Sequence, residues 1–111
     1  MIDRGGALEA IDRILNRGGD ADDVLRAVLD AVHGRGVSYA AIRFVEDGAL
    51  VDGPSIGSPT DVRTTPIVYQ GELVGELDLA TDDDSFAERV ATLISAHVLV
   101  GWDTGGRPWS P

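Results

Sequence analysis

The sequence predicts an α+β domain: an antiparallel sheet of about five strands with the N-terminal and C-terminal helices packed on one face. Two amphipathic stretches near the N-terminus and one long apolar stretch near the C-terminus have helical periodicity. The region between them has the period of β-strands, and the dipeptides Asp47-Gly48 and Gln70-Gly71 divide it into hairpins. Because 111 residues are enough for one core, we expect a single domain over residues 1–100, followed by a Gly/Pro/Trp tail over 101–111.

The first two elements are predicted to be helices that each bury one face. Between residues 3 and 16 the apolar side chains recur at intervals of three and four, at Ala7, Leu8, Ile11, Ile14 and Leu15. Gly18-Gly19 ends this helix, and the carboxylate of Asp20 is expected to cap the next one. The second helix then extends to about Val32, before the glycines at 34 and 36.

The strands begin at Val37, where the run VSYAAIRFV is apolar or small on both faces apart from Arg43, as in a central strand. A short strand over 49–51 follows, and the prolines and glycine of PSIGSPTD predict a loop over 54–61. A further strand from Val62 enters the second hairpin. In the last strand, Leu73, Gly75, Leu77 and Leu79 are expected in the core, with Glu72, Val74, Glu76 and Asp78 toward water.

The third helix is predicted from Phe86 to about Val100, with Ser85 and Glu88 as a capping box. The three aspartates before it, 82–84, suit the positive end of the helix dipole, and this interpretation is favoured over a calcium site because the ligand spacing of an EF-hand is missing. The tail holds both tryptophans of the chain. Trp102 and Trp109 either cover the domain's own apolar surface or meet a partner.

Composition argues against several classes of function. The formal net charge of −10 disfavours nucleic acid and anionic membranes as partners. The sequence has no cysteine, which excludes disulfides, thiolate metal sites and cysteine nucleophiles, and it has no zinc-binding histidine motif and no phosphate-binding loop, so no metal or cofactor is expected. The N-terminus MIDRGGALEA has no apolar segment and no apolar run reaches membrane length, which predicts a cytoplasmic protein.

The ordered set of elements resembles the GAF domain, a sensor module related to PAS domains. The resemblance rests on the strand YAAIRFVEDGALV, the hairpin PIVYQGELVGELDLAT and the final helix FAERVATLISAHV, and it covers about residues 7–100. It implies a GAF/PAS-like sheet. In that family an insertion roofs a small-molecule pocket, and here only PSIGSPTD stands in its place, so the chain is predicted to be truncated over the pocket, without the family's cyclic-nucleotide, haem or bilin sites.

Two groups of residues are candidate sites. Tyr39, Arg43, Glu76 and Asp78 are predicted to share the open face of the sheet, where Arg43 would bind a carboxylate or phosphate of a small ligand. The favoured alternative is that Arg43 forms an ordinary cross-strand ion pair with Glu76 or Asp78. The second group is a helical dimer interface, Leu8, Ile11, Leu15, Val90, Ile94 and His97, with His97 interpreted as a packing or interface residue.

Together these features predict a non-enzymatic, GAF-like sensory, signalling or protein-interaction module, homodimeric through its terminal helices. A small-ligand receptor that uses the open sheet face is the alternative, and an enzyme of unrecognised type is the least favoured reading. The enzymatic branch of the family that reduces free methionine sulfoxide works through cysteines, and this sequence has none.

Overall fold

The computed structural model describes residues 2–59 and 61–102, with side chains up to residue 98. The predicted tail, including Trp109, lies outside the described residues from position 103 on. The elements are α1 (Arg4–Arg17), α2 (Ala21–Gly34), β1 (Tyr39–Glu46), β2 (Ala49–Gly57), β3 (Arg63–Tyr69), β4 (Glu72–Leu79) and α3 (Asp84–Trp102).

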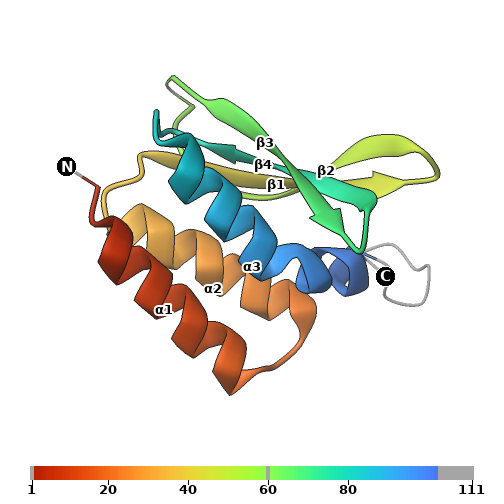
Figure 1. Cartoon of the computed structure of the whole chain (residues 1–111), viewed down its shortest axis with the longest axis horizontal. Coiled ribbons are helices and arrows are strands. Elements are labelled where there is room, and N and C mark those ends of the chain that lie inside the picture. Colours follow the sequence, from red (N-terminus) through yellow and green to blue (C-terminus); the bar gives the residue numbers. More distant parts are fainter. Residues whose placement is uncertain (1, 60, 103–111) are drawn as a thin grey trace.

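The four strands form one antiparallel sheet in the order β2-β1-β4-β3. All three helices lie on one face of it, with α2 and α3 against the strands and α1 packed on those two helices farther from the sheet (Figure 1). The α+β class and the placement of the helices are therefore confirmed. The sheet has four strands rather than about five.

The core lies between the sheet and the helices. β1 contributes Ile42 and Phe44, and β4 contributes Leu77 and Leu79, all at most 1% exposed. The helices meet them with side chains at the spacing expected from the sequence: Ala7, Ile11, Leu25, Val28, Val32, Val90 and Ile94. No helix among the described residues is long and apolar enough to cross a membrane.

Two helix starts differ from expectation. Asp20 stands at the N-cap of α2, but within the described part of the chain its side chain makes no capping hydrogen bond. At α3 the cap is Asp83 rather than Ser85, because Asp83 Oδ1 accepts the amide hydrogen of Phe86 at 3.0 Å. Thr81 fixes this arrangement, since its Oγ1 accepts the Asp83 amide hydrogen at 3.1 Å. The helix therefore begins at the earlier of two available caps.

The loop predicted over 54–61 is wrong in its first half, because β2 continues to Gly57. The pairing with β1 shifts between Ala41 and Arg43, which accommodates one extra residue of β2. A Cβ on Gly53 at this bulge would collide with the Phe44 ring, so the position requires glycine. Pro54 is tolerated because β2 is an edge strand. The connection to β3 is accordingly shorter than predicted.

A second bulge changes the burial of β4. Ile67 pairs with Gly75 but Val68 pairs with Leu73, so Val74 is an extra residue. Successive side chains at such a bulge point to the same face, and the alternation predicted for this strand fails there. Leu73, expected in the core, is 47% exposed, and Val74, expected toward water, is 7% exposed.

Candidate functional site

The face of the sheet without helices is built from cross-strand rows of side chains. At its centre, Arg43 of β1 stands opposite Asp52 of β2 and Glu76 of β4, which we call the charged row. One step toward the two hairpin turns lies the apolar row, Leu50, Val45, Leu73 and Val68, in which Val45 pairs with Leu50 and Val68 with Leu73. Each strand of the sheet contributes one residue to the apolar row.

Arg43 is the centre of a network of polar side chains. Its Nη2 lies 2.8 Å from Glu76 Oε1 and donates to Asp78 Oδ1 at 2.9 Å. Thr64 Oγ1 on β3 donates to the same Asp78 oxygen at 2.7 Å. The network therefore joins β1, β4 and β3. The guanidinium is 29% exposed, and its buried Nε has no hydrogen-bond partner among the described residues.

This geometry favours the cross-strand ion pair over the ligand site. Two carboxylates already neutralise one guanidinium, so an anionic ligand would have to displace Glu76 or Asp78 from Arg43. Tyr39 shares the open face but pairs with Gly57 at the far end of β1, two rows away from Arg43. The structure thus brings together three of the four predicted site residues.

Thr64 is the site residue that the sequence did not reveal. A hairpin closed at Gln70-Gly71 with regular pairing would place Thr64 opposite Leu77, on the core side of the sheet. The bulge at Val74 shifts the pairing by one residue, and Thr64 then faces Asp78. No turn residue marks this bulge, so only the regular pairing could be derived from the sequence.

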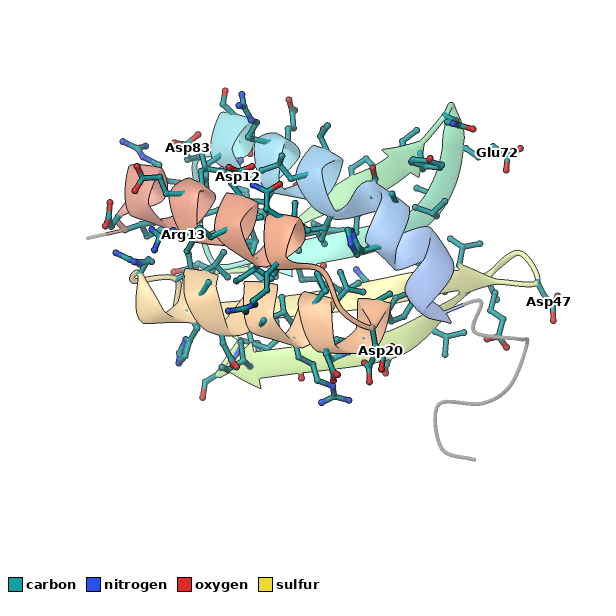
Figure 2. All side chains as sticks on the ribbon, turned by 90° about the horizontal axis from the view of Figure 1, so that it is seen from below. Asp12, Arg13, Asp20, Asp47, Glu72 and Asp83 are labelled. Atoms are coloured by element: carbon teal, nitrogen blue, oxygen red, sulfur yellow. The ribbon has the colours of Figure 1, made fainter. Side chains whose placement is uncertain are left out.

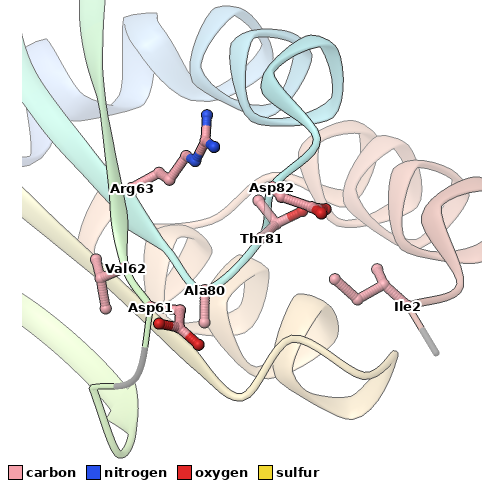
Figure 3. Close-up of a pocket in the computed structure, with 7 residues that line it drawn as sticks. All are labelled: Ile2, Asp61, Val62, Arg63, Ala80, Thr81 and Asp82. Atoms are coloured by element: carbon pink, nitrogen blue, oxygen red, sulfur yellow. The ribbon is translucent and has the colours of Figure 1, made fainter.

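A second candidate is a hollow of about 560 Å³ at the end of the sheet farthest from the hairpin turns (Figure 3). Its lining consists of Ile2, Asp61, Val62, Arg63, Ala80, Thr81 and Asp82. Arg63 is held by Asp84 at 2.9 Å, and Thr81 is occupied in the cap of α3. Among the described residues, no three histidine, cysteine or acidic side chains are grouped as a metal site would need. Two of the polar side chains that line the hollow, Arg63 and Thr81, are therefore already engaged within the chain.

The predicted helical interface is divided between core and surface. Ile11, Val90 and Ile94 are 0%, 1% and 0% exposed, so they pack inside the chain and are not available to a second subunit in this arrangement. The other three residues are half-buried: Leu8, Leu15 and His97. The Nδ1 atom of His97 is buried without a hydrogen-bond partner among the described residues.

The comparisons with known proteins find similarity in structure only. No family model matches the sequence, and no curated protein matches it. The structure of fRMsr of Staphylococcus aureus in complex with substrate superposes with a TM-score of 0.73 at 11% identity, covering 88% of this chain and 97% of that one.

Two further similar structures are named as GAF domains. The GAF domain from the Acinetobacter phosphoenolpyruvate-protein phosphotransferase has a TM-score of 0.65 at 12% identity, over 82% of this chain and 91% of that one. The A. aeolicus nlh2 GAF domain in an inactive state has a TM-score of 0.63 at 16% identity, over 95% and 97%.

The prediction that this chain is not an enzyme is contradicted by the first of these structures. fRMsr is a methionine sulfoxide reductase, and it has this fold over nearly its whole length at 11% identity. The fold therefore gives no ground for denying enzyme activity. A mechanism that uses a thiol nevertheless has no residue to carry it in these 111 positions, since cysteine is missing from the sequence.

Proposed function

The chain has a GAF-like fold, and on that premise we propose that it is a regulatory module that binds a protein partner through the open face of its sheet. The observation that carries this proposal is the apolar row. Among the side chains described, the large hydrophobic ones that are exposed are Leu50, Leu73 and Val68, at 42%, 47% and 48%. All three belong to that row.

Gathered apolar side chains on a surface favour a binding role. Isolated exposed hydrophobic residues are common and need no explanation. A group of exposed hydrophobic residues has an unfavourable contact with water, and a partner that covers the group removes this cost. In the apolar row, Val45 pairs with Leu50 across β1 and β2, Val68 pairs with Leu73 across β3 and β4, and Val45 is half-buried. The helical side of the molecule has no comparable group among its described residues.

A photo-crosslinking amino acid introduced at position 73 tests the proposal in cells of the protein's own host. We expect a crosslinked adduct of defined mass from position 73. The matched control is position 30 on α2, which is also exposed but lies on the helical side, and no such adduct is expected there. Equal adducts at both positions, or none at position 73, would contradict a partner on the sheet face.

A homodimer through the terminal helices is the second candidate. It is favoured by the half-buried Leu8, Leu15 and His97 of the terminal helices. Light scattering coupled to size-exclusion chromatography decides it. A mass twice that of the 11.7 kDa chain, lost in Leu8→Glu, would support the dimer, and a clean monomer would reject it.

A further inference from the structure

We propose that the segment bound by the open face is cationic and amphipathic, a short stretch of a partner protein with apolar side chains flanked by arginine or lysine. This inference rests on the proposed function, because it assigns a chemistry to the partner of the same surface. Its basis is the distribution of charge around the apolar row.

Carboxylates border the apolar row on both sides. On the side of the hairpin turns, Glu46 ends β1, Asp47 follows it in the turn and Glu72 begins β4, and all three are exposed. Figure 2 shows Asp47 and Glu72 at the hairpin end of the sheet. These carboxylates lie at the end of the sheet next to the apolar row, so they add negative charge to the field around it.

The other side of the row is acidic as well. Asp52 and Glu76 lie in the charged row, and Asp78 lies one row further on. Arg43 is the one basic side chain among the described residues of the open face, and it is bound to Glu76 and Asp78. Its charge is already compensated by those carboxylates. Basic groups along the two sides of a docked segment would therefore be attracted by carboxylates on either side of the row.

The edges of the sheet argue for docking on the face. Pro54 lies in β2 and Pro66 in β3, the two edge strands, and proline has no amide hydrogen to donate to an added strand. A partner that extended the sheet would lose a ladder hydrogen bond at either edge. The face offers apolar contact without that loss.

The charge of the whole chain selects against other occupants. The net charge of −10 repels a second copy of the same chain, an anionic membrane and nucleic acid. A cationic segment is the class of partner that is attracted both by the carboxylates near the apolar row and by the net charge of the whole chain.

Three synthetic helical peptides of about 14 residues, roughly 21 Å long, serve as probes. One has a stripe of leucines with arginines along both sides of the stripe, and the second and third replace either the arginines by glutamate or the leucines by serine. Fluorescence anisotropy of labelled peptides against the full chain measures the affinity. We expect the Leu/Arg peptide to bind at least about tenfold more tightly than either of the others.

Variants of the row test where the peptide binds. The double substitution Leu50→Ser with Leu73→Ser is expected to weaken binding of the Leu/Arg peptide by about tenfold or more. Its control, Ala10→Ser with Ala27→Ser on the helices, should leave the affinity within about twofold. Circular dichroism and urea unfolding of each variant establish that it is folded.

A pair of charge variants separates local from overall attraction. Replacing Glu46, Asp47 and Glu72 by their amides removes three charges beside the row, and replacing Asp12, Asp23 and Asp30 by asparagine removes three from the helical side. The first variant should weaken binding by about tenfold and reduce its salt dependence, and the second should change it by less than about twofold. Equal effects would overturn the inference, since attraction would then reflect net charge alone.

The remaining outcomes assign the face to another occupant. If the Leu/Glu or Leu-free peptide binds equally well, the partner class is wrong, while a crosslink at position 73 still supports the proposed function. If the chain self-associates and Leu73→Ser abolishes this, a second copy is the occupant. Each of these results overturns the cationic partner.

Discussion

At the scale of single residues, Arg43 is the side chain on which the open face depends most. It is 29% exposed and bridges Glu76 and Asp78, which are themselves 25% and 16% exposed. Without its charge these two carboxylates would face each other with only partial access to water, an arrangement that costs more than the loss of an ordinary surface ion pair.

We therefore expect Arg43→Met to lower the free energy of unfolding by about 1–2 kcal/mol, between the values for exposed and buried ion pairs. Urea denaturation measures it. Arg13→Met on α1 is the control, because its pair with Glu9 is 3.9 Å long between side chains that are 74% and 78% exposed, and it should change stability by less than about 0.5 kcal/mol. Equal effects would show that the Arg43 network stabilises the protein no more than an exposed surface ion pair does.

Asp83 connects α3 to α1. It caps α3 through the Phe86 amide and forms an ion pair with Arg4. The hydrogen bond from the Phe86 amide, reinforced by the hydrogen bond from Arg4, holds the pKa of the Asp83 carboxyl below its usual range. The charged form is therefore favoured in the folded state relative to the unfolded one.

The sign of the pH effect follows from this lowered pKa. The unfolded chain protonates Asp83 near its ordinary pKa of about 3.9, whereas the folded chain keeps it charged to lower pH. The stabilisation is complete above the unfolded value and is lost as the pH falls through the folded value. Asp83→Asn keeps a capping oxygen but removes the charge, so it should be less stable than the parent at about pH 7, and the difference should narrow by about pH 2. Chemical denaturation at both pH values measures the difference, and a gap that persists in acid would contradict the assignment.

At the scale of elements, the bulges of β2 and β4 decide which side chains face outward. Gly75 follows the extra residue Val74, and its backbone lies directly over α3. A Cβ at this position would collide with the carbonyl oxygen of Arg43 and lie 3.0 Å from Val98 Cγ1. The strand can approach the helix only because there is no side chain.

Gly75→Ala is accordingly expected to destabilise the protein by about 2–3 kcal/mol, through displacement of β1 or α3. Its control is Gly5→Ala in α1, where the added Cβ meets nothing within 4 Å and alanine is the better helix former. Thermal unfolding followed by circular dichroism compares the two. A neutral Gly75→Ala would mean that the backbone at the bulge relaxes easily.

The same elements show which features of the fold could be predicted from the sequence. The helices and the buried positions of Leu77 and Leu79 on β4 are predicted correctly, because apolar residues at periods of 3.6 and 2 leave little choice of face. The outward position of Arg43 and Glu76 follows from that period as well. The prediction fails for Leu73 and Val74, and the sequence does not reveal Thr64. The same bulge in β4 determines the positions of all three residues. That bulge is fixed by contact of Gly75 with α3, a tertiary contact that no local pattern records.

At the scale of the whole molecule, the formal net charge of −10 is carried by a chain of 111 residues. Compaction brings these carboxylates together, so self-repulsion opposes folding until salt screens it. The same repulsion limits self-association in dilute salt.

We expect the free energy of unfolding to rise by on the order of 1 kcal/mol between about 0.01 M and about 1 M sodium chloride, as the Debye length falls from about 30 Å to about 3 Å. Urea denaturation at both concentrations measures this. The triple variant of Asp12, Asp23 and Asp30 to asparagine should show a smaller rise. A stability that falls with salt would indicate that the ion pairs outweigh the net repulsion.

The strand order divides the sheet into two halves that are joined by a single pair of strands. α1, α2, β1 and β2 come from the first half of the chain and β3, β4 and α3 from the second, and within the sheet the halves meet only where β1 pairs with β4. Each half contains a hairpin of neighbours in sequence, so we expect the long-range β1–β4 pairing to form after the two hairpins. We therefore expect that a chain divided between β2 and β3 gives two fragments that can reassociate. Arg43 would lie on one fragment, and its ion-pair partners Glu76 and Asp78 would lie on the other.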